Sequence, residues 1–125
     1  MPSFRDAVEA GDLAAIEAVL DPSVTFRSPV VFKPYEGREP VMALLSLVIQ
    51  VFEDFRYVDQ LEGAGSECLV FKARVGDREL DGIDYLRLGE DGLVTELTVM
   101  VRPFSALTAL RDAMGAKLEA LASGA

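Results

Sequence analysis

Hydrophobic residues recur at two different spacings along the chain. In most of the segment before Phe55 they recur every three or four positions, as they do on one face of a helix. From Phe55 to about residue 102 they alternate with polar residues, which is typical of strands that bury one face. The helical spacing then returns. Helices followed by a set of neighbouring strands predict an α+β domain.

Capping and breaking residues place the first two helical segments. Ser3 can cap a helix, and the glycine of Gly11–Asp12 interrupts it before the pattern resumes. Asp21–Pro22 is expected to end this second segment. Residues 23–37 then suggest a short strand and a loop interrupted by prolines.

A stronger helical stripe covers residues 38–53, with Pro40 in a position that suits a first turn. The closing helix follows Pro103, and Ser105 is its expected cap. The residues of that helix expected to face inward are Leu107, Leu110, Met114, Leu118 and Leu121.

Four strands are predicted in the alternating part of the chain. The segments between them, GAGS, GD and GEDG, are rich in glycine and typical of tight turns. Such turns predict an antiparallel meander. The predicted strands cover residues 54–62, 67–75, 78–88 and 93–102. With no repeat or linker in between, we expect one domain over residues 1–125.

The register of these strands gives Asp84 an unusual position. Counting from a two-residue turn at residues 76–77 places Asp84 opposite Leu69. Counting back from a four-residue turn at residues 89–92 places it opposite Leu97. On this face Asp84 is the only ionisable group among apolar residues. Gly82, two positions earlier, is expected to leave room beside it or to permit a bend of the sheet.

A buried carboxylate without a partner is costly, and two interpretations remain open. In the first, Asp84 bonds a helix end, a tyrosine or ordered water and only organises the core. In the second, it lies at the bottom of an apolar cavity, where loss of hydration raises its pKa and its carboxyl faces a ligand.

Composition removes several classes of function. The net charge of −9 and the absence of basic runs argue against binding of nucleic acid or of an anionic membrane. There is no histidine, and Cys68 is the one cysteine, so internal disulfides, Cys/His zinc sites and histidine-dependent catalysis are excluded. No metal or cofactor is expected. The amino terminus lacks signal-peptide features, and the longest apolar run has 12 residues, so we expect a cytoplasmic protein.

Two stretches together resemble a known superfamily over nearly the whole chain. They are AGDLAAIEAVLDPSVTFRSPVVFKPYEGREPVMALL and LDGIDYLRLGEDGLVTELTVMV. Both are similar to nuclear transport factor 2-like proteins, and most of all to the SnoaL-like polyketide cyclase and ketosteroid isomerase branches. The resemblance implies a cone-shaped, curved antiparallel sheet wrapped by N-terminal helices, with a C-terminal helix. It also implies an internal pocket and homodimers formed through the outer sheet face.

The resemblance also assigns expected roles to individual residues. Asp84 falls on the acid that stays protonated in ketosteroid isomerases and donates a hydrogen bond to the substrate oxyanion. Phe4 falls on the catalytic tyrosine and Ser28 on the catalytic base, while Leu20 and Leu45 fall on supporting pocket tyrosines. Serine cannot abstract a carbon-bound proton without a base of its own, so ordinary steroid isomerase activity is not expected.

These arguments predict a pocket for a small, mostly apolar molecule. Asp84 and Ser28 are the candidate catalytic residues, and the chemistry would be polarisation of a carbonyl or enolate. The expected ligand-binding residues are Phe4, Leu20, Phe26, Tyr35, Leu45, Tyr57, Leu69, Phe71, Leu97, Val99 and Val101. The alternative is a non-catalytic dimeric or partner-binding module. Its outer face would use Val70, Ile83, Tyr85 and Met100.

Overall fold

The computed structural model describes residues 3–123 and contains four helices and six strands within them. The elements in chain order are α1 (Phe4–Glu9), α2 (Leu13–Val19), β1 (Leu20–Arg27), β2 (Tyr35–Glu36), α3 (Arg38–Val51), β3 (Glu53–Gly63), β4 (Ser66–Val75), β5 (Arg78–Leu88), β6 (Val94–Arg102) and α4 (Phe104–Ser123).

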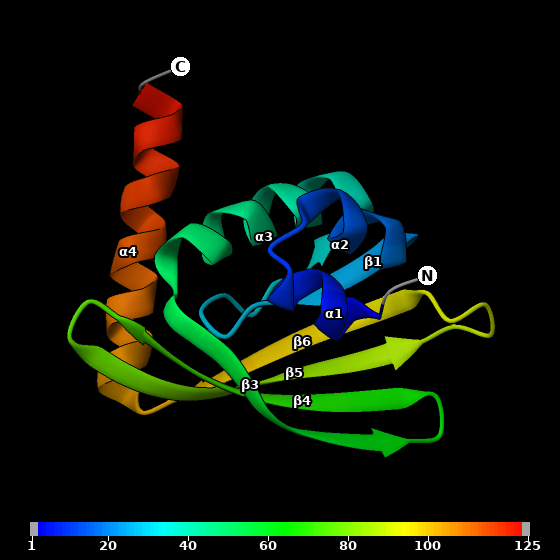
Figure 1. Ribbon diagram of the computed structural model, residues 1–125. Coiled ribbons are helices and arrows are strands. Elements are labelled where there is room, and N and C mark those ends of the chain that lie inside the picture. The colour runs from blue at the N-terminus through cyan, green and yellow to red at the C-terminus, as the bar shows by residue number, and fades with distance from the viewer. Residues whose placement is uncertain (1–2, 124–125) are drawn as a thin grey trace.

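The six strands form one curved, open sheet in the order β2-β1-β6-β5-β4-β3. The helices α1, α2 and α3 lie on one side of this sheet, and α4 stands across one end of it (Figure 1). This arrangement confirms the α+β fold class. The sheet is mixed rather than purely antiparallel, because β1 runs parallel to β6. The expected antiparallel meander holds for β3 to β6.

The register of the central hairpin is confirmed, whereas that of the next one is shifted. Asp84 pairs with Leu69 of β4, as the two-residue turn predicts. On β6 it pairs with Val99 and not with Leu97. One residue of the shift arises in the turn, because Leu88 pairs with Val94 and not with Leu93. The other arises at an irregularity between Arg87 and Leu88, where the Thr95 hydroxyl donates to the Arg87 carbonyl. From Glu96 onward the shift amounts to two residues, so these side chains keep their predicted faces, whereas Val94 takes the inward position expected for Leu93.

Two expected helix boundaries are wrong. The second helix ends at Val19, and Asp21–Pro22 lies inside β1, because the fully buried Leu20 already has an extended backbone. Ser105 is not the cap of α4. That helix begins at Phe104, and the carbonyl of Pro103 accepts its first backbone hydrogen bonds.

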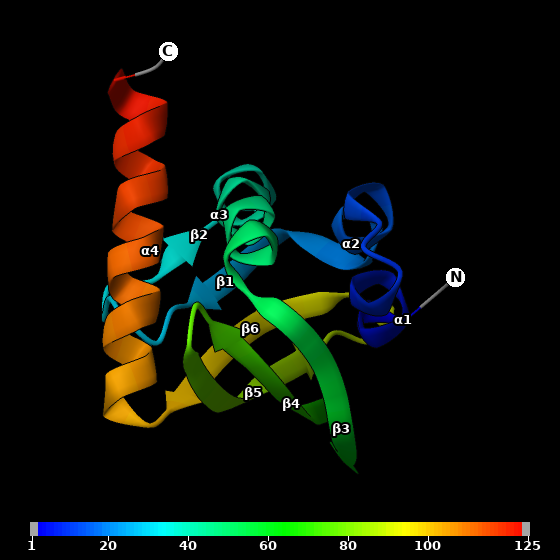
Figure 2. The ribbon, with the colours of Figure 1, turned by 60° about the vertical axis from the view of Figure 1, so that its left-hand side comes forward.

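The lower half of α4 packs against the protein and its upper half does not. Leu110 is buried, whereas Leu118 and Leu121 are 46% and 61% exposed. The inward orientation expected for Leu121 is therefore wrong, whereas Leu118 is partly exposed but borders the cavity described below. Figure 2 shows the reason, because the end of α4 rises past α3 and has no element beside it. Among the described residues, no helix combines the length and apolar character that crossing a membrane requires.

Gly82 serves a packing role and leaves no empty space. A Cβ atom at this position would lie 2.3 Å from Cζ of Phe71. The ring of Phe71 therefore occupies the room that the sequence suggested beside Asp84. This ring also packs against Phe55 and Phe52, with ring centroids 4.8 and 5.6 Å apart. The contacts fix β5, β4 and the start of β3 relative to one another.

Candidate functional site

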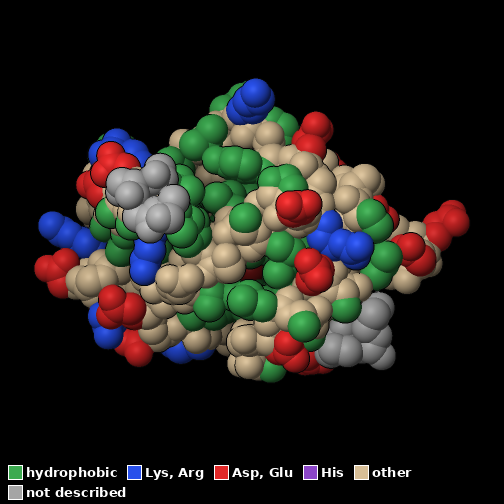
Figure 3. All heavy atoms as spheres, turned by 90° about the horizontal axis from the view of Figure 1, so that it is seen from above, with side chains coloured by type: hydrophobic (Ala, Val, Ile, Leu, Met, Phe, Trp, Pro, Cys, Tyr) green, Lys and Arg blue, Asp and Glu red, His purple; other side chains and the backbone are tan. Residues whose placement is uncertain are grey.

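A cavity of about 590 Å³ lies between the concave face of the sheet and the helices. Figure 3 shows the molecule hollowed between hydrophobic side chains on the face seen from above. The lining residues are Phe4, Val8, Glu9, Ile16, Phe26, Ser28, Pro29, Val30, Val31, Tyr35, Leu44, Leu45, Val48, Ile49, Phe52, Phe55, Arg56, Tyr57, Asp84, Leu97, Val99, Leu110, Arg111, Met114, Gly115 and Leu118. The volume and the apolar lining are typical of small-molecule sites.

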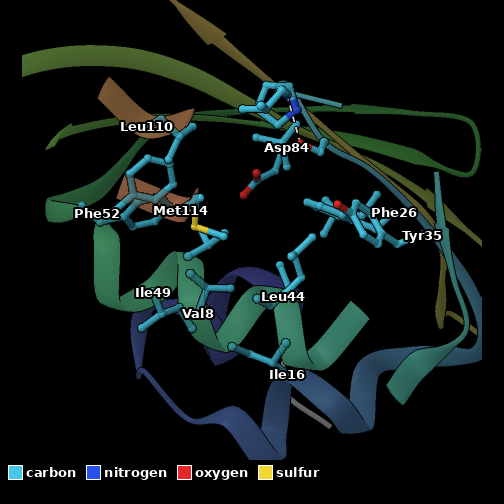
Figure 4. Close-up of a pocket in the computed structure, with 18 of the residues that line it drawn as sticks. Val8, Ile16, Phe26, Tyr35, Leu44, Ile49, Phe52, Asp84, Leu110 and Met114 are labelled. Carbon is cyan, nitrogen blue, oxygen red and sulfur yellow. Dashed lines mark hydrogen bonds between the residues drawn. The ribbon is translucent and has the colours of Figure 1, made fainter. Parts of the chain in front are cut away.

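The structure brings most of the predicted site residues together. Asp84 projects into the cavity from β5, Phe26 and Tyr35 lie on one side of it, and α4 lies on the other (Figure 4). The predicted residues that border the cavity are Phe4, Phe26, Ser28, Tyr35, Leu45, Tyr57, Asp84, Leu97 and Val99.

Four predicted lining residues do not border this cavity. Leu20, Leu69 and Phe71 are fully buried in the core. Phe71, for example, lies against Gly82 on one side and is covered by Phe55 on another. Val101 instead lines a second pocket of about 520 Å³, which lies beside the loop that follows β1.

The residues that sequence reasoning missed come mainly from α3, α4 and the loop after β1. Leu44 and Ile49 belong to the apolar side of α3, and Leu110 and Met114 to that of α4. Helical periodicity placed Leu44, Leu110 and Met114 on inward-facing stripes, but it does not tell which inward residues meet solid core and which meet a cavity. Ile49 lay outside the predicted stripe and is 40% exposed. The charged lining residues Glu9, Arg56 and Arg111 gave no signal in the sequence.

Asp84 is held by a tyrosine from a different strand. The Tyr57 hydroxyl donates a hydrogen bond of 2.6 Å to Oδ2 of Asp84. Through the ladder of β3, β4 and β5, Tyr57 is level with Phe71 and then Gly82, two residues from Asp84. Among the described residues, only Tyr57 forms a hydrogen bond with this carboxyl group. In the same part of the chain, no fully buried side-chain N or O atom lacks a hydrogen-bond partner. The second oxygen of Asp84 is therefore available to the cavity.

Burial changes the acidity of both groups. Loss of hydration raises the pKa of Asp84 from 3.8 to about 7, although the hydrogen bond from Tyr57 acts in the opposite direction. Burial, and then the negative charge of Asp84, raise the pKa of the Tyr57 hydroxyl far above its usual value. Tyr57 consequently remains a donor at neutral pH. Asp84 is present there in both protonated and ionised forms, and its protonated form can donate to a ligand.

Both sequence-based interpretations of Asp84 are thus partly realised. The carboxyl group has a tyrosine partner, as the purely structural interpretation requires. It also borders an apolar cavity, as the ligand-binding interpretation requires. One oxygen serves each purpose, so the two interpretations do not exclude each other.

Ser28 borders the cavity but is engaged in its own loop. Its Oγ accepts hydrogen bonds from the backbone N–H groups of Val30 and Val31, at 3.0 and 3.4 Å. In residues 3–123, no carboxylate or lysine is hydrogen-bonded to it that could act as its base. The geometry gives Ser28 a role in shaping the cavity wall.

Charged side chains stand near the Tyr57–Asp84 pair. The guanidinium of Arg5 lies 5.6 Å from the centre of the Tyr57 ring and forms an ion pair of 3.5 Å with Glu9. Across the described part of the chain, no group of three acidic, cysteine or histidine side chains is arranged to hold a metal ion.

Comparison with known proteins identifies solved structures that are similar to this chain in sequence and fold. A steroid delta-isomerase from Pseudomonas aeruginosa is 44% identical, with a TM-score of 0.89, and the match covers 94% of this chain and 87% of that one. An uncharacterised bacterial protein with a cystatin-like fold from Silicibacter pomeroyi DSS-3 is 37% identical, with a TM-score of 0.88 over 93% and 82% of the two chains.

A more distant structure shares the fold alone. A nuclear transport factor 2-like protein of unknown function from Cytophaga hutchinsonii is 21% identical, with a TM-score of 0.63 over 84% of this chain and 88% of that one. No curated protein matches the chain. The family model described as "SnoaL-like domain" matches residues 3–97. The chain therefore belongs to the SnoaL-like domain family of the nuclear transport factor 2-like superfamily.

Proposed function

We propose that the cavity binds a small, mostly apolar molecule and that protonated Asp84 donates one hydrogen bond to an oxygen of that molecule. The observation that carries this proposal is a buried carboxyl group with one oxygen bonded to Tyr57 and the other available to an apolar cavity of about 590 Å³. Pockets of this kind obtain affinity from their apolar walls and orientation from a few polar groups.

The chemistry supported by this arrangement is polarisation of a carbonyl or enolate oxygen. Tyr57 donates to one Asp84 oxygen, which favours the ionised acid, while burial favours the protonated acid. A ligand oxygen that gains negative charge would accept the proton of Asp84 more strongly than a neutral oxygen does. The relative from Pseudomonas aeruginosa bears the name steroid delta-isomerase, a reaction type in which such polarisation is useful.

The proposal does not extend to abstraction of a carbon-bound proton. Phe4 has no acid–base group, and the Ser28 oxygen is occupied by backbone N–H groups of its own loop. A base would have to be supplied by the substrate itself or by another group. Binding with carbonyl polarisation is therefore the function that this site supports best.

A matched pair of ligands tests the proposal. 2-Acetylnaphthalene and 2-ethylnaphthalene have similar apolar bodies, but only the ketone can accept a hydrogen bond. We expect the wild-type protein to bind the ketone roughly fivefold more tightly, in line with one net hydrogen bond. In Asp84→Leu this preference should disappear while the hydrocarbon still binds. Equal affinities in the wild type, or an unchanged preference in the variant, would contradict the role of Asp84.

A second candidate function, assembly into a homodimer, is favoured by the outer sheet face. Met100 is 53% exposed there, and Val70, Ile83 and Tyr85 are partly exposed beside it. The charges around this apolar strip already have partners in their own chain. Glu96 pairs with Arg27 and Arg87, and Asp81 pairs with Lys72 and Arg102. A second copy could cover the strip without leaving these charges unpaired.

A further inference from the structure

One polar side chain of the cavity wall has no hydrogen-bond partner in the described part of the chain. The lining side chains that carry a nitrogen or oxygen atom are Glu9, Ser28, Tyr35, Arg56, Tyr57, Asp84 and Arg111. All of them except Tyr35 are engaged within the chain, in hydrogen bonds or in an ion pair. Within residues 3–123 the Tyr35 side chain makes a ring contact and no hydrogen bond, so its hydroxyl is available to a ligand.

The short strand β2 directs Tyr35 toward the cavity. Tyr35 pairs with Phe26 of β1, and residues directly opposite each other on neighbouring strands share one face of the sheet. Phe26 is 2% exposed, and its ring centroid lies 6.3 Å from that of Tyr35. The next residue, Glu36, is exposed, as the alternation of side chains requires. Figure 4 shows the Tyr35 side chain reaching into the cavity beside Phe26.

Tyr35 and Asp84 enter the cavity from different walls. In the sheet order, β1 and β6 lie between β2 and β5, so the two backbones are three strand spacings apart. Three spacings correspond to about 14 Å along the sheet. The curvature of the sheet and the length of the side chains shorten this separation, and both side chains point toward the same space (Figure 4). The two polar groups therefore address different parts of one ligand rather than adjacent atoms.

We propose that the ligand carries a second oxygen, remote from the one that binds Asp84, and that the Tyr35 hydroxyl forms a hydrogen bond with this second oxygen. This inference rests on the proposed function and adds the class of ligand, a mostly apolar molecule with two separated oxygen functions. A ligand with only apolar atoms beside Tyr35 would cover the hydroxyl and leave it without a partner, which costs affinity. A hydroxyl both donates and accepts, so it can bind a ligand hydroxyl in either direction.

The test uses two naphthyl ketones that differ at the end remote from the ketone. In 6-hydroxymethyl-2-acetylnaphthalene and 6-ethyl-2-acetylnaphthalene the two substituents have nearly the same size, but only the alcohol can form a hydrogen bond. Binding is measured by calorimetry. In Tyr35→Phe we expect the ratio of the alcohol affinity to the ethyl affinity to fall roughly fivefold to tenfold. The affinity for the ethyl compound should stay the same or rise, because no hydroxyl is then left without a partner.

Two further variants control for location and for the role of Asp84. Tyr85→Phe removes the same hydroxyl group from the outer sheet face, where Tyr85 lies beside Arg87 and does not line the cavity. It should leave the affinity ratio unchanged. Asp84→Leu removes the partner of the ketone, which both compounds carry. It should weaken both compounds by the same factor and also leave the ratio unchanged.

The outcomes separate this inference from the function on which it rests. If Tyr35→Phe leaves the ratio unchanged while Asp84→Leu weakens both compounds, the second oxygen is wrong and the ketone site remains. An equal loss of both compounds in Tyr35→Phe would also overturn the inference, because it would show that Tyr35 acts through the shape of the cavity. A similar fall of the ratio in Tyr85→Phe would have the same consequence. If Asp84→Leu changes neither affinity, the proposed function fails and this inference fails with it.

Discussion

Asp84 is the residue on which the site depends, and its position in the sequence was enough to single it out. Alternation of side chains placed one acid on an apolar face, and the confirmed pairing with Leu69 kept it there. The identity of its partner could not be predicted. Tyr57 reaches Asp84 across the intervening strand β4, and that contact depends on the curvature of the sheet and on side-chain direction.

The raised pKa of Asp84 predicts how stability depends on pH. In the unfolded chain this pKa is 3.8, and in the folded protein it is about 7, so between these values the folded state binds more protons. The stabilisation is complete below pH 3.8 and is lost as the pH rises through 7. The change contributed by Asp84 is up to roughly 4 kcal/mol in the free energy of unfolding.

Asp84→Asn tests this dependence. Asparagine is neutral at every pH and can still accept the hydrogen bond of Tyr57, so the variant should lack the loss of stability between pH 4 and pH 8. At pH 8 it should be more stable than the wild type. Denaturant unfolding across this range measures the difference. Parallel curves for the two proteins would show that Asp84 ionises as readily in the folded state as in the unfolded state.

At the scale of elements, turn length predicted pairing only where the turn was tight. The two-residue turn between β4 and β5 left no room for another register, and the prediction for that hairpin is confirmed. The longer turn before β6 brings Val94 rather than Leu93 opposite Leu88. An irregularity at Thr95, whose hydroxyl donates to a backbone carbonyl, adds a second residue of shift. Nothing in the hydrophobic pattern reports a local hydrogen bond of this kind, so the register was wrong by two residues.

Packing between β5 and β4 predicts a strict requirement for glycine at position 82. A methyl group there would lie 2.3 Å from the fully buried ring of Phe71, which cannot move freely. We expect Gly82→Ala to lower the free energy of unfolding by about 1–3 kcal/mol. Combining it with Phe71→Leu should cost less than the sum of the two single changes, because the shorter side chain relieves the clash. Additive losses in thermal or denaturant unfolding would contradict this explanation.

Gly115 in α4 provides the opposite case. It lies inside a 20-residue helix, and a Cβ atom at this position would meet nothing within 4 Å. Glycine inside a helix is less favourable than alanine by roughly 0.5–1 kcal/mol, so Gly115→Ala should stabilise the protein by about that amount. Chemical unfolding of the variant beside the wild type measures this gain. A loss of stability would mean that α4 needs the glycine for a bend or a contact.

At the scale of the whole molecule, the layered architecture was predictable but the extent of the cavity was not. The order of patterns and the superfamily resemblance gave a curved sheet with helices on one side, and both are confirmed. Helical periodicity treats every inward residue alike. It therefore placed Leu121 on the inward side, although the end of α4 rises past the body of the protein. It also missed Arg56 and Arg111, since exposed charges on amphipathic elements are the ordinary case.

The apolar strip on the outer sheet face predicts that the protein is a dimer in solution. If two copies pair through the strip around Met100, the mass measured by sedimentation should be about twice that of the 13.6 kDa chain at micromolar concentration. Met100→Glu places a charge on this exposed position and should yield a folded monomer, because an uncompensated charge in an interface is costly. Leu13→Glu, an equally drastic change at an exposed position on α2, should remain a dimer. A wild-type monomer, or loss of the dimer in both variants, would contradict an interface on this face.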